Sequence, residues 1–218
     1  MKFKLLLRRR RRPSTDAGAR VNTAISRKIP ALLLGALLSS AVNAQSPGQP
    51  VAPRLFFPGG VLNVYAPDAE GWVITGLGSN GISFGKRGGE AVETYGSQVV
   101  IFEMPPTDGG EEMVDWVKKR IAEMNPPPRF QETDSSYRYT EDRGYPCVDA
   151  HIGLDDKAAV TPVGEKQLKL QVLALYRRHP EQEQPGFLAA YSHRGKTADD
   201  QMEAAAKGFI EGVNVPEK

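Results

Sequence analysis

Apolar and polar positions follow two different periods along the chain beyond residue 53. In residues 109–125 the apolar side chains recur at helical spacing and share one face: Met113, Trp116, Val117, Ile121 and Met124. Two glutamates at positions 111 and 112 suit the positive end of a helix dipole, and three prolines at 126–128 stop the pattern. The spacing predicts a helix over this segment.

Short apolar runs bounded by turn residues predict strands elsewhere. The candidates are residues 61–67, 71–75, 82–87, 97–104, 129–142, 145–153, 168–178 and 186–194. Asn80-Gly81 and Arg143-Gly144 separate neighbouring runs and predict tight turns. The run at 97–104 has a continuous apolar centre, which is typical of a strand buried on both faces.

A second helix is predicted near the end of the chain. Thr197 and Asp200 have the spacing of a capping box. The expected buried stripe consists of Met202, Ala205, Ala206, Phe209 and Ile210. The order of elements is strands, helix, strands, helix, without regular βαβ alternation. This order predicts the α+β class, a mostly antiparallel sheet with two main helices packed on it.

The first 44 residues have the three-part layout of a secretory signal. A basic region precedes a short apolar run near residues 29–38, and Val42-Asn43-Ala44 supplies small residues for a signal peptidase. We expect cleavage between Ala44 and Gln45, export to the periplasm, a disordered linker at 45–53 and a single domain at 54–218. The apolar run is shorter than the ~20 residues of a spanning helix, so we expect no stable transmembrane segment in the mature chain.

Removing the signal reverses the sign of the net charge. Of the 28 Lys and Arg, 10 lie in residues 1–44, and of the 26 Asp and Glu only Asp16 lies there. The remaining chain carries 18 basic and 25 acidic residues, a net charge of −7. Binding to nucleic acid requires clustered Lys and Arg, so we expect no nucleic-acid partner.

The one cysteine of the chain, Cys147, stands four residues before His151. In a strand both side chains point to the same face but lie about 13 Å apart, at ~3.3 Å per residue. A nucleophile and its base need to be within hydrogen-bonding distance, so these two cannot form a dyad. A thiol site would need His179 or His193 from a neighbouring strand. A thiol-dependent or hydrolytic envelope enzyme using Cys147 is therefore the alternative interpretation.

Other motifs point away from catalysis and cofactors. Residues 76–81 match G-x-G-x-x-G, but a strand candidate follows where a dinucleotide site needs a helix, so we expect a glycine-rich hairpin and no cofactor. His151, His179 and His193 lack the spacing of metal ligands in sequence, and we expect no metal site. Ser192 lacks the G-x-S-x-G context of a hydrolase nucleophile.

Basic residues stand at the adjacent ends of the last two predicted strands. If the strands pair, one patch could form on an otherwise acidic domain from Arg177, Arg178, His179, His193 and Arg194. Such a patch would suit a small anionic ligand or an envelope protein. We take it as the candidate binding surface.

The pattern over residues 55–214 resembles that of the PsbP-like α/β family. The resemblance is carried by Gly71-Trp72, the run at 97–104, the Trp116 helix, the turn at Gly144, the strand ends LALYRR and AAYSHR, and the final helix with AAAKGFI. The pattern of the chain is also similar to that of small exported proteobacterial proteins of unknown function. The resemblance implies a non-catalytic binding or accessory protein, and no functional residue is carried over from it.

Overall fold

The computed structural model describes residues 48–59, 61–107, 109–161, 163–164, 166–180 and 185–216. The predicted signal peptide, its cleavage site and the first three residues of the predicted linker lie outside the described residues. Most of the polar loop between the last two strands, residues 181–184, also lies outside them.

The core of the fold is an eight-stranded antiparallel sheet in the order β1-β4-β5-β6-β10-β9-β8-β7. Its strands are β1 (Gln49–Pro50), β4 (Val73–Gly78), β5 (Gly81–Arg87), β6 (Thr94–Glu103), β7 (Phe130–Thr140), β8 (Cys147–Asp156), β9 (Leu168–Arg178) and β10 (Pro185–Gly195). A separate ribbon pairs β2 (Phe56–Phe57) with β3 (Val64–Tyr65). The predicted α+β class and antiparallel sheet are confirmed.

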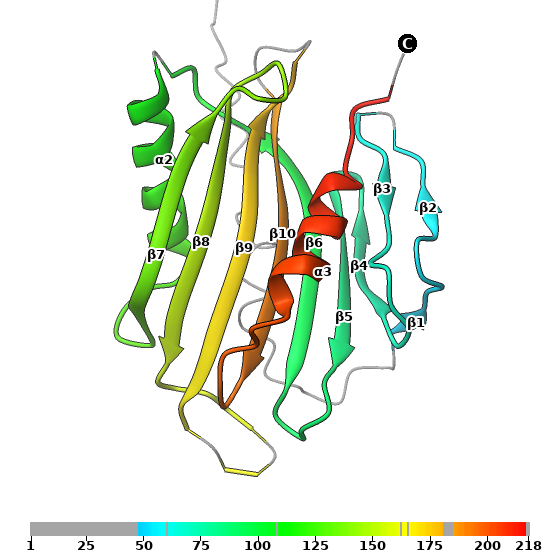
Figure 1. Cartoon of the computed structure of the whole chain (residues 1–218), viewed down its shortest axis with the longest axis vertical. Coiled ribbons are helices and arrows are strands. Elements are labelled where there is room, and N and C mark those ends of the chain that lie inside the picture. Colours follow the sequence, from blue (N-terminus) through cyan, green and yellow to red (C-terminus); the bar gives the residue numbers. More distant parts are fainter. Residues whose placement is uncertain are drawn as a thin grey trace, which may run out of the picture. The chain divides into compact units, whose positions relative to one another are not determined.

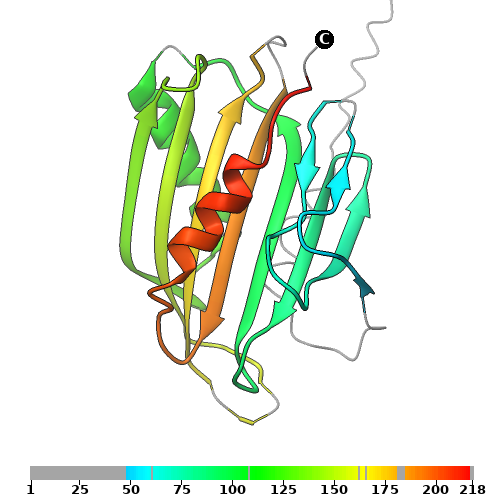
Figure 2. The same cartoon turned by 45° about the vertical axis from the view of Figure 1, so that its right-hand side comes forward.

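The two described helices cover opposite faces of the sheet. Helix α2 (Gly110–Met124) packs on β7 and β8, and α3 (Met202–Glu211) crosses the other face over β9 and β10 (Figures 1 and 2). The chain runs from β6 through α2 to β7 at the far edge and then returns strand by strand, so β10 pairs with β6 in the middle of the sheet.

Successive side chains of a strand point to opposite faces of the sheet, so the central strands contribute to the core on both faces. In β10, Phe187, Ala189 and Tyr191 pack under α3 with Phe209, whereas Leu188 and Ala190 pack under α2 with residues such as Met113 and Val117. In β6, Val99 and Val100 are 2% and 9% exposed although they face opposite sides. The predicted burial of this strand on both faces is therefore confirmed.

The structure departs from three local expectations. The chain enters the sheet before residue 54, because Gln49 and Pro50 pair with β4 and Val51 is buried. The Thr197–Asp200 capping box does not form: α3 begins at Met202, and the backbone N–H of Gln201 donates to Asp199 Oδ1. Ala205 is exposed, because the helix buries a narrower stripe than the periodicity predicts.

Two glycines allow the β7–β8 hairpin to close as it does. Gly144 has φ of +79°, a left-handed conformation that suits the predicted turn. Gly153 lies opposite a β-bulge in β7, where a Cβ would come within 2.8 Å of the Asp134 carbonyl oxygen. A larger residue at 153 would separate the edge strand from the sheet.

Candidate functional site

The antiparallel register separates the five basic residues expected to form one patch. Arg178 lies opposite Gly186, whereas Arg194 lies opposite Leu170 at the other end of the β9–β10 pair. Gly186 and Arg194 are eight residues apart in β10, which is about 26 Å at ~3.3 Å per residue. Arg177, Arg178 and His179 therefore lie at one end of the sheet, and His193 and Arg194 at the other.

Arg177 is enclosed by aromatic rings. Its guanidinium lies 4.2 Å from the ring centroid of Tyr145 and 4.7 Å from that of Phe187, and it donates to the Val213 carbonyl oxygen. It is 3% exposed, and burial lowers its pKa to about 10, which leaves it charged at neutral pH. These contacts join β9 to the segment after α3, so this charge is used within the fold.

Arg178 and His179 are also engaged. Arg178 donates to the Pro105 carbonyl oxygen at 2.6 Å and to Thr107 Oγ1 at 3.3 Å. His179 is 5% exposed, and its backbone N–H donates to the Pro185 carbonyl oxygen. Both residues therefore hold the β9–β10 end of the sheet against neighbouring segments.

Arg194 belongs to a buried ion cluster. Asp156 is fully buried, and its two carboxylate oxygens accept from Arg129 at 3.0 and 3.1 Å and from Arg194 at 2.5 Å. Burial alone would raise the pKa of Asp156, but the hydrogen bonds from the two arginines outweigh it and lower the pKa. Arg194 thus compensates a carboxylate on the face covered by α2.

His193 lies in a polar cluster that sequence reasoning missed. It is 2% exposed, with Nε2 3.0 Å from Glu93 Oε1 and Nδ1 3.3 Å from Gln171 Oε1. The hydroxyl of Tyr95 lies 3.0 Å from Asp199 Oδ2 and 3.3 Å from Glu93 Oε1, and it shares its one proton between the two carboxylates. The backbone N–H of Asp199 donates to Gln171 Oε1. The His193 hydrogen bond is the largest cause of the lowered pKa of Glu93.

The cluster joins the β5–β6 turn, β6, β9, β10 and the approach to α3. Glu93 is separated from His193 by 100 residues, so no local motif signals the pairing. The Gly88-Gly89 turn only positions Glu93: a Cβ at Gly88 would overlap Glu93 Oε2, and the Gly89 N–H donates to the same oxygen at 2.7 Å.

Cys147 is a core residue. It is fully buried under α3, its Sγ lies 3.3 Å from the Tyr145 carbonyl oxygen, and burial raises its pKa to about 12. His151 is exposed on the same strand, and β8 spans both residues as predicted. The thiol is therefore protonated and enclosed, which is the opposite of an activated nucleophile.

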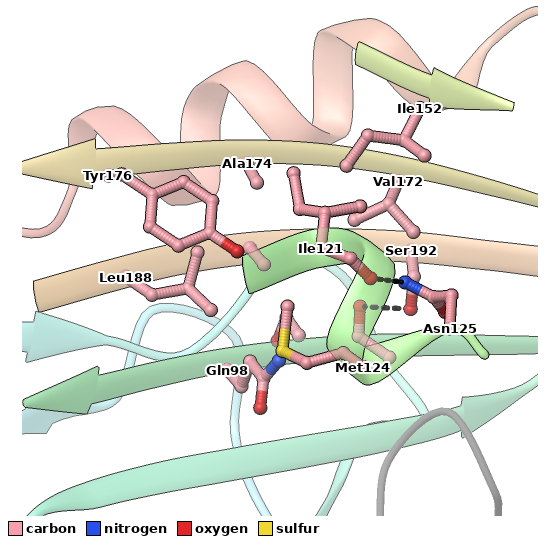
Figure 3. A pocket seen from close by; sticks show the side chains of 13 residues that line it. Gln98, Ile121, Met124, Asn125, Ile152, Val172, Ala174, Tyr176, Leu188 and Ser192 are labelled. Carbon is pink, nitrogen blue, oxygen red and sulfur yellow. Dashed lines mark hydrogen bonds between the residues drawn. The ribbon is translucent and has the colours of Figure 1, made fainter. Parts of the chain in front are cut away.

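A pocket lies between the end of α2 and the middle of the sheet; we call it the α2 pocket (Figure 3). Its volume is about 40 Å³. Figure 3 shows its walls coming from α2 on one side and from β6, β8, β9 and β10 on the other. The lining residues are Gly96, Ser97, Gln98, Ile121, Met124, Asn125, Ile152, Val172, Ala174, Tyr176, Leu188, Ala190 and Ser192.

The polar atoms of the α2 pocket are incompletely paired. Three buried side-chain atoms of its lining residues have no hydrogen-bond partner among the described residues, namely Ser97 Oγ and the amide oxygens Gln98 Oε1 and Asn125 Oδ1. Asn125 is 8% exposed, and its Nδ2 donates to the Ile121 carbonyl oxygen at 2.9 Å. Buried acceptors are nearly always paired in native structures, so two in one apolar pocket mark it as a site for a hydrogen-bonding guest.

A larger depression lies on the opposite face, beside α3; we call it the α3-side hollow. Its volume is about 440 Å³, and it is open to solvent between β7, β8 and β9. Two of its polar side chains are paired with neighbours: Lys169 with Asp155 at 2.7 Å, and Gln171 with His193 and the backbone N–H of Asp199. The hollow has a larger volume than the α2 pocket but contains fewer buried polar atoms that lack a hydrogen-bond partner in the described part of the chain.

Within the part of the chain that the structure describes, no group of three or more His, Cys, Asp or Glu side chains is arranged to hold a metal ion. None of the described helices combines the length and the apolarity needed to cross a membrane.

Comparison with known proteins gives the chain no family. No family model matches it, and no curated protein matches it.

Proposed function

We propose that this protein is an exported, non-catalytic binding or accessory domain with a PsbP-like α/β fold, and that the α2 pocket is its ligand site. The antiparallel sheet with a helix on each face is compatible with that family, and the signal-like first 44 residues support export to the periplasm. The basic residues of the last two strands take no part in this site, because each is engaged within the fold.

The observation that carries the proposal is the pair of unpaired amide oxygens, Gln98 Oε1 and Asn125 Oδ1, on residues that line a mostly apolar pocket. Ligand sites typically combine apolar walls with a few placed polar groups. An acceptor buried without a partner costs about 1–3 kcal/mol, so a fold that retains two of them gains by pairing them with a guest.

The buried and protonated state of Cys147 favours binding over thiol catalysis. A thiolate is the reactive form of cysteine, and a thiol with a pKa of about 12 supplies very little of it near neutral pH. No observation in the described residues favours the thiol-dependent alternative.

The test is an amide NMR comparison of three forms of the protein against a low-molecular-mass extract of the envelope fraction. Ala190→Leu fills the α2 pocket, since Ala190 lines it and is 5% exposed. Ala205→Leu makes the same change on the exposed side of α3 and is the matched control.

We expect the extract to shift amide signals of residues 121–125 and 188–192 in the wild type and in the control, but not in Ala190→Leu. Equal shifts in all three forms, or no shift at these residues in the wild type, would contradict the α2 pocket as the ligand site.

A further inference from the structure

We infer that the α2 pocket selects a small neutral molecule that donates hydrogen bonds, such as a short-chain alcohol or an alcohol group at the end of a longer molecule, and rejects anions. This inference rests on the proposed function and specifies the ligand class of the same site. Three independent features of the pocket lead to it.

The first feature is the absence of charge. None of the thirteen lining residues is Asp, Glu, Lys, Arg or His. Tyr176 is the one lining phenol, and burial raises its pKa, so its hydroxyl stays neutral. Arg120, a cation whose charge acts on Tyr176, pairs with Glu123 at 3.4 Å. An anion entering the pocket would lose its hydration without gaining a counter-charge.

The second feature is the direction of the unmet hydrogen bonds. Because Asn125 Nδ2 donates to Ile121, the orientation of this amide is set and its free atom is the oxygen. Gln98 presents a second free oxygen. Ser192 Oγ donates its proton to the Gly96 carbonyl oxygen at 3.3 Å, so its remaining capacity is also that of an acceptor. The two amide oxygens can only accept, so a guest that pairs them must supply the protons, whereas the unpaired Ser97 hydroxyl can donate or accept.

The third feature is size and wall chemistry. A volume of about 40 Å³ exceeds the ~10–15 Å³ that holds one water molecule but is far below the ~300–1,000 Å³ of a drug-sized site. Methyl and methylene groups of Ile121, Met124, Ile152, Val172 and Leu188 form most of the wall. The site suits a group of a few heavy atoms with one polar end.

The test uses three probes of four heavy atoms each: 2-propanol, which donates and accepts; acetone, which only accepts; and acetate, which is an anion. Each is titrated into the 15N-labelled wild-type protein, and dissociation constants are taken from amide shifts at residues 121–125 and 188–192. The same titrations are made on Ala190→Leu, Ala205→Leu and Gln98→Met. The last variant removes one acceptor and keeps the length of the side chain.

We expect 2-propanol to bind the wild type at least about tenfold more tightly than acetone, and acetate to give no saturable shift. Gln98→Met should reduce the preference for 2-propanol over acetone several-fold while both still bind, and Ala205→Leu should match the wild type. Because Gln98 is only partly buried, this variant tests the inference even if Ala190→Leu fails to fold.

The possible failures are distinguishable. If acetone or acetate binds as tightly as 2-propanol, and binding is lost in Ala190→Leu, the pocket is a binding site but the ligand class is overturned. If none of the probes shifts pocket amides in the wild type, the binding site itself is refuted together with its ligand class.

Discussion

At the scale of single residues, the charged and polar side chains of this protein act mainly as internal links. Arg177 lies between two aromatic rings, Arg194 neutralises Asp156, and His193 bridges Glu93 and Gln171. Each of these residue types is a normal component of binding and catalytic sites. Their burial here gives them structural roles, because a buried charge or imidazole requires its partners to remain in place.

The state of Cys147 leads to a first prediction. The native thiol should react with iodoacetamide at least about 100-fold more slowly than the same thiol in urea, because burial both blocks access and raises its pKa to about 12. Intact-mass spectrometry after timed alkylation measures both rates. Equal rates in native and unfolded protein would mean that Cys147 is accessible and would revive a thiol-based activity.

A second prediction concerns the Asp156 ion cluster and pH. The pKa of Asp156 is lowered in the folded state, so its contribution to stability is present above the unfolded-state pKa of about 3.9 and is lost as pH falls through the folded-state value. Asp156→Asn should lower the free energy of unfolding at pH 7 by about 3–5 kcal/mol, because it leaves two arginines without their buried partner. Urea unfolding at pH 7 and pH 3.5 measures both effects.

The matched control is Asp149→Asn. Asp149 pairs with Arg138 at 2.6 Å, but the arginine side chain is 69% exposed. Exposed pairs contribute about 0–1 kcal/mol, so this variant should unfold nearly like the wild type. A similar loss in both variants would show that burial does not distinguish the two ion pairs.

At the scale of elements, local periodicity was sufficient to locate α2 and the long strands. The helix predicted over 109–125 is α2 at Gly110–Met124, and the strand predicted over 168–178 is β9 with the same ends. It was insufficient where a contact between segments distant in sequence decides the outcome. β1 is two residues long and exists because β4 lies beside it, and α3 starts where Asp199, held by Tyr95 and Gln171, directs the chain.

A third prediction tests the anchoring of α2. Met113 is fully buried against the β7–β8 half of the sheet, so Met113→Ala should lower the free energy of unfolding by about 2–5 kcal/mol. Lys119→Ala, on the exposed side of the same helix, should change it by less than about 0.5 kcal/mol. Chemical unfolding followed by circular dichroism compares the two. A small loss for Met113→Ala would mean that α2 is not anchored through this face.

At the scale of the whole molecule, the return of the chain from β7 to β10 places β10 against β6 and creates two separate cores. Helix α2 packs mainly on β7 and β8. Its C-terminal end lies over the middle of the sheet, and the α2 pocket forms between this end and the strands. Its walls come from five elements and from the segment after α2.

The proposal of export is also tested at this scale. We expect protein recovered from the envelope fraction to have the intact mass of a chain that begins at Gln45. Recovery of the uncleaved chain would contradict the predicted cleavage between Ala44 and Gln45. The recovered chain without the signal would carry the net charge of −7.

The sequence by itself determined the class of the fold, because helix and strand periods depend on neighbours within a few residues and on which face is buried. It also excluded a Cys147–His151 dyad, because strand geometry sets their separation. The tertiary structure alone decided which basic residues meet and where a pocket opens. Antiparallel direction places the C-terminal ends of β9 and β10 at opposite ends of the pair. The tertiary structure also joins Glu93 to His193, and Arg129 and Arg194 to Asp156, across separations that no local pattern encodes.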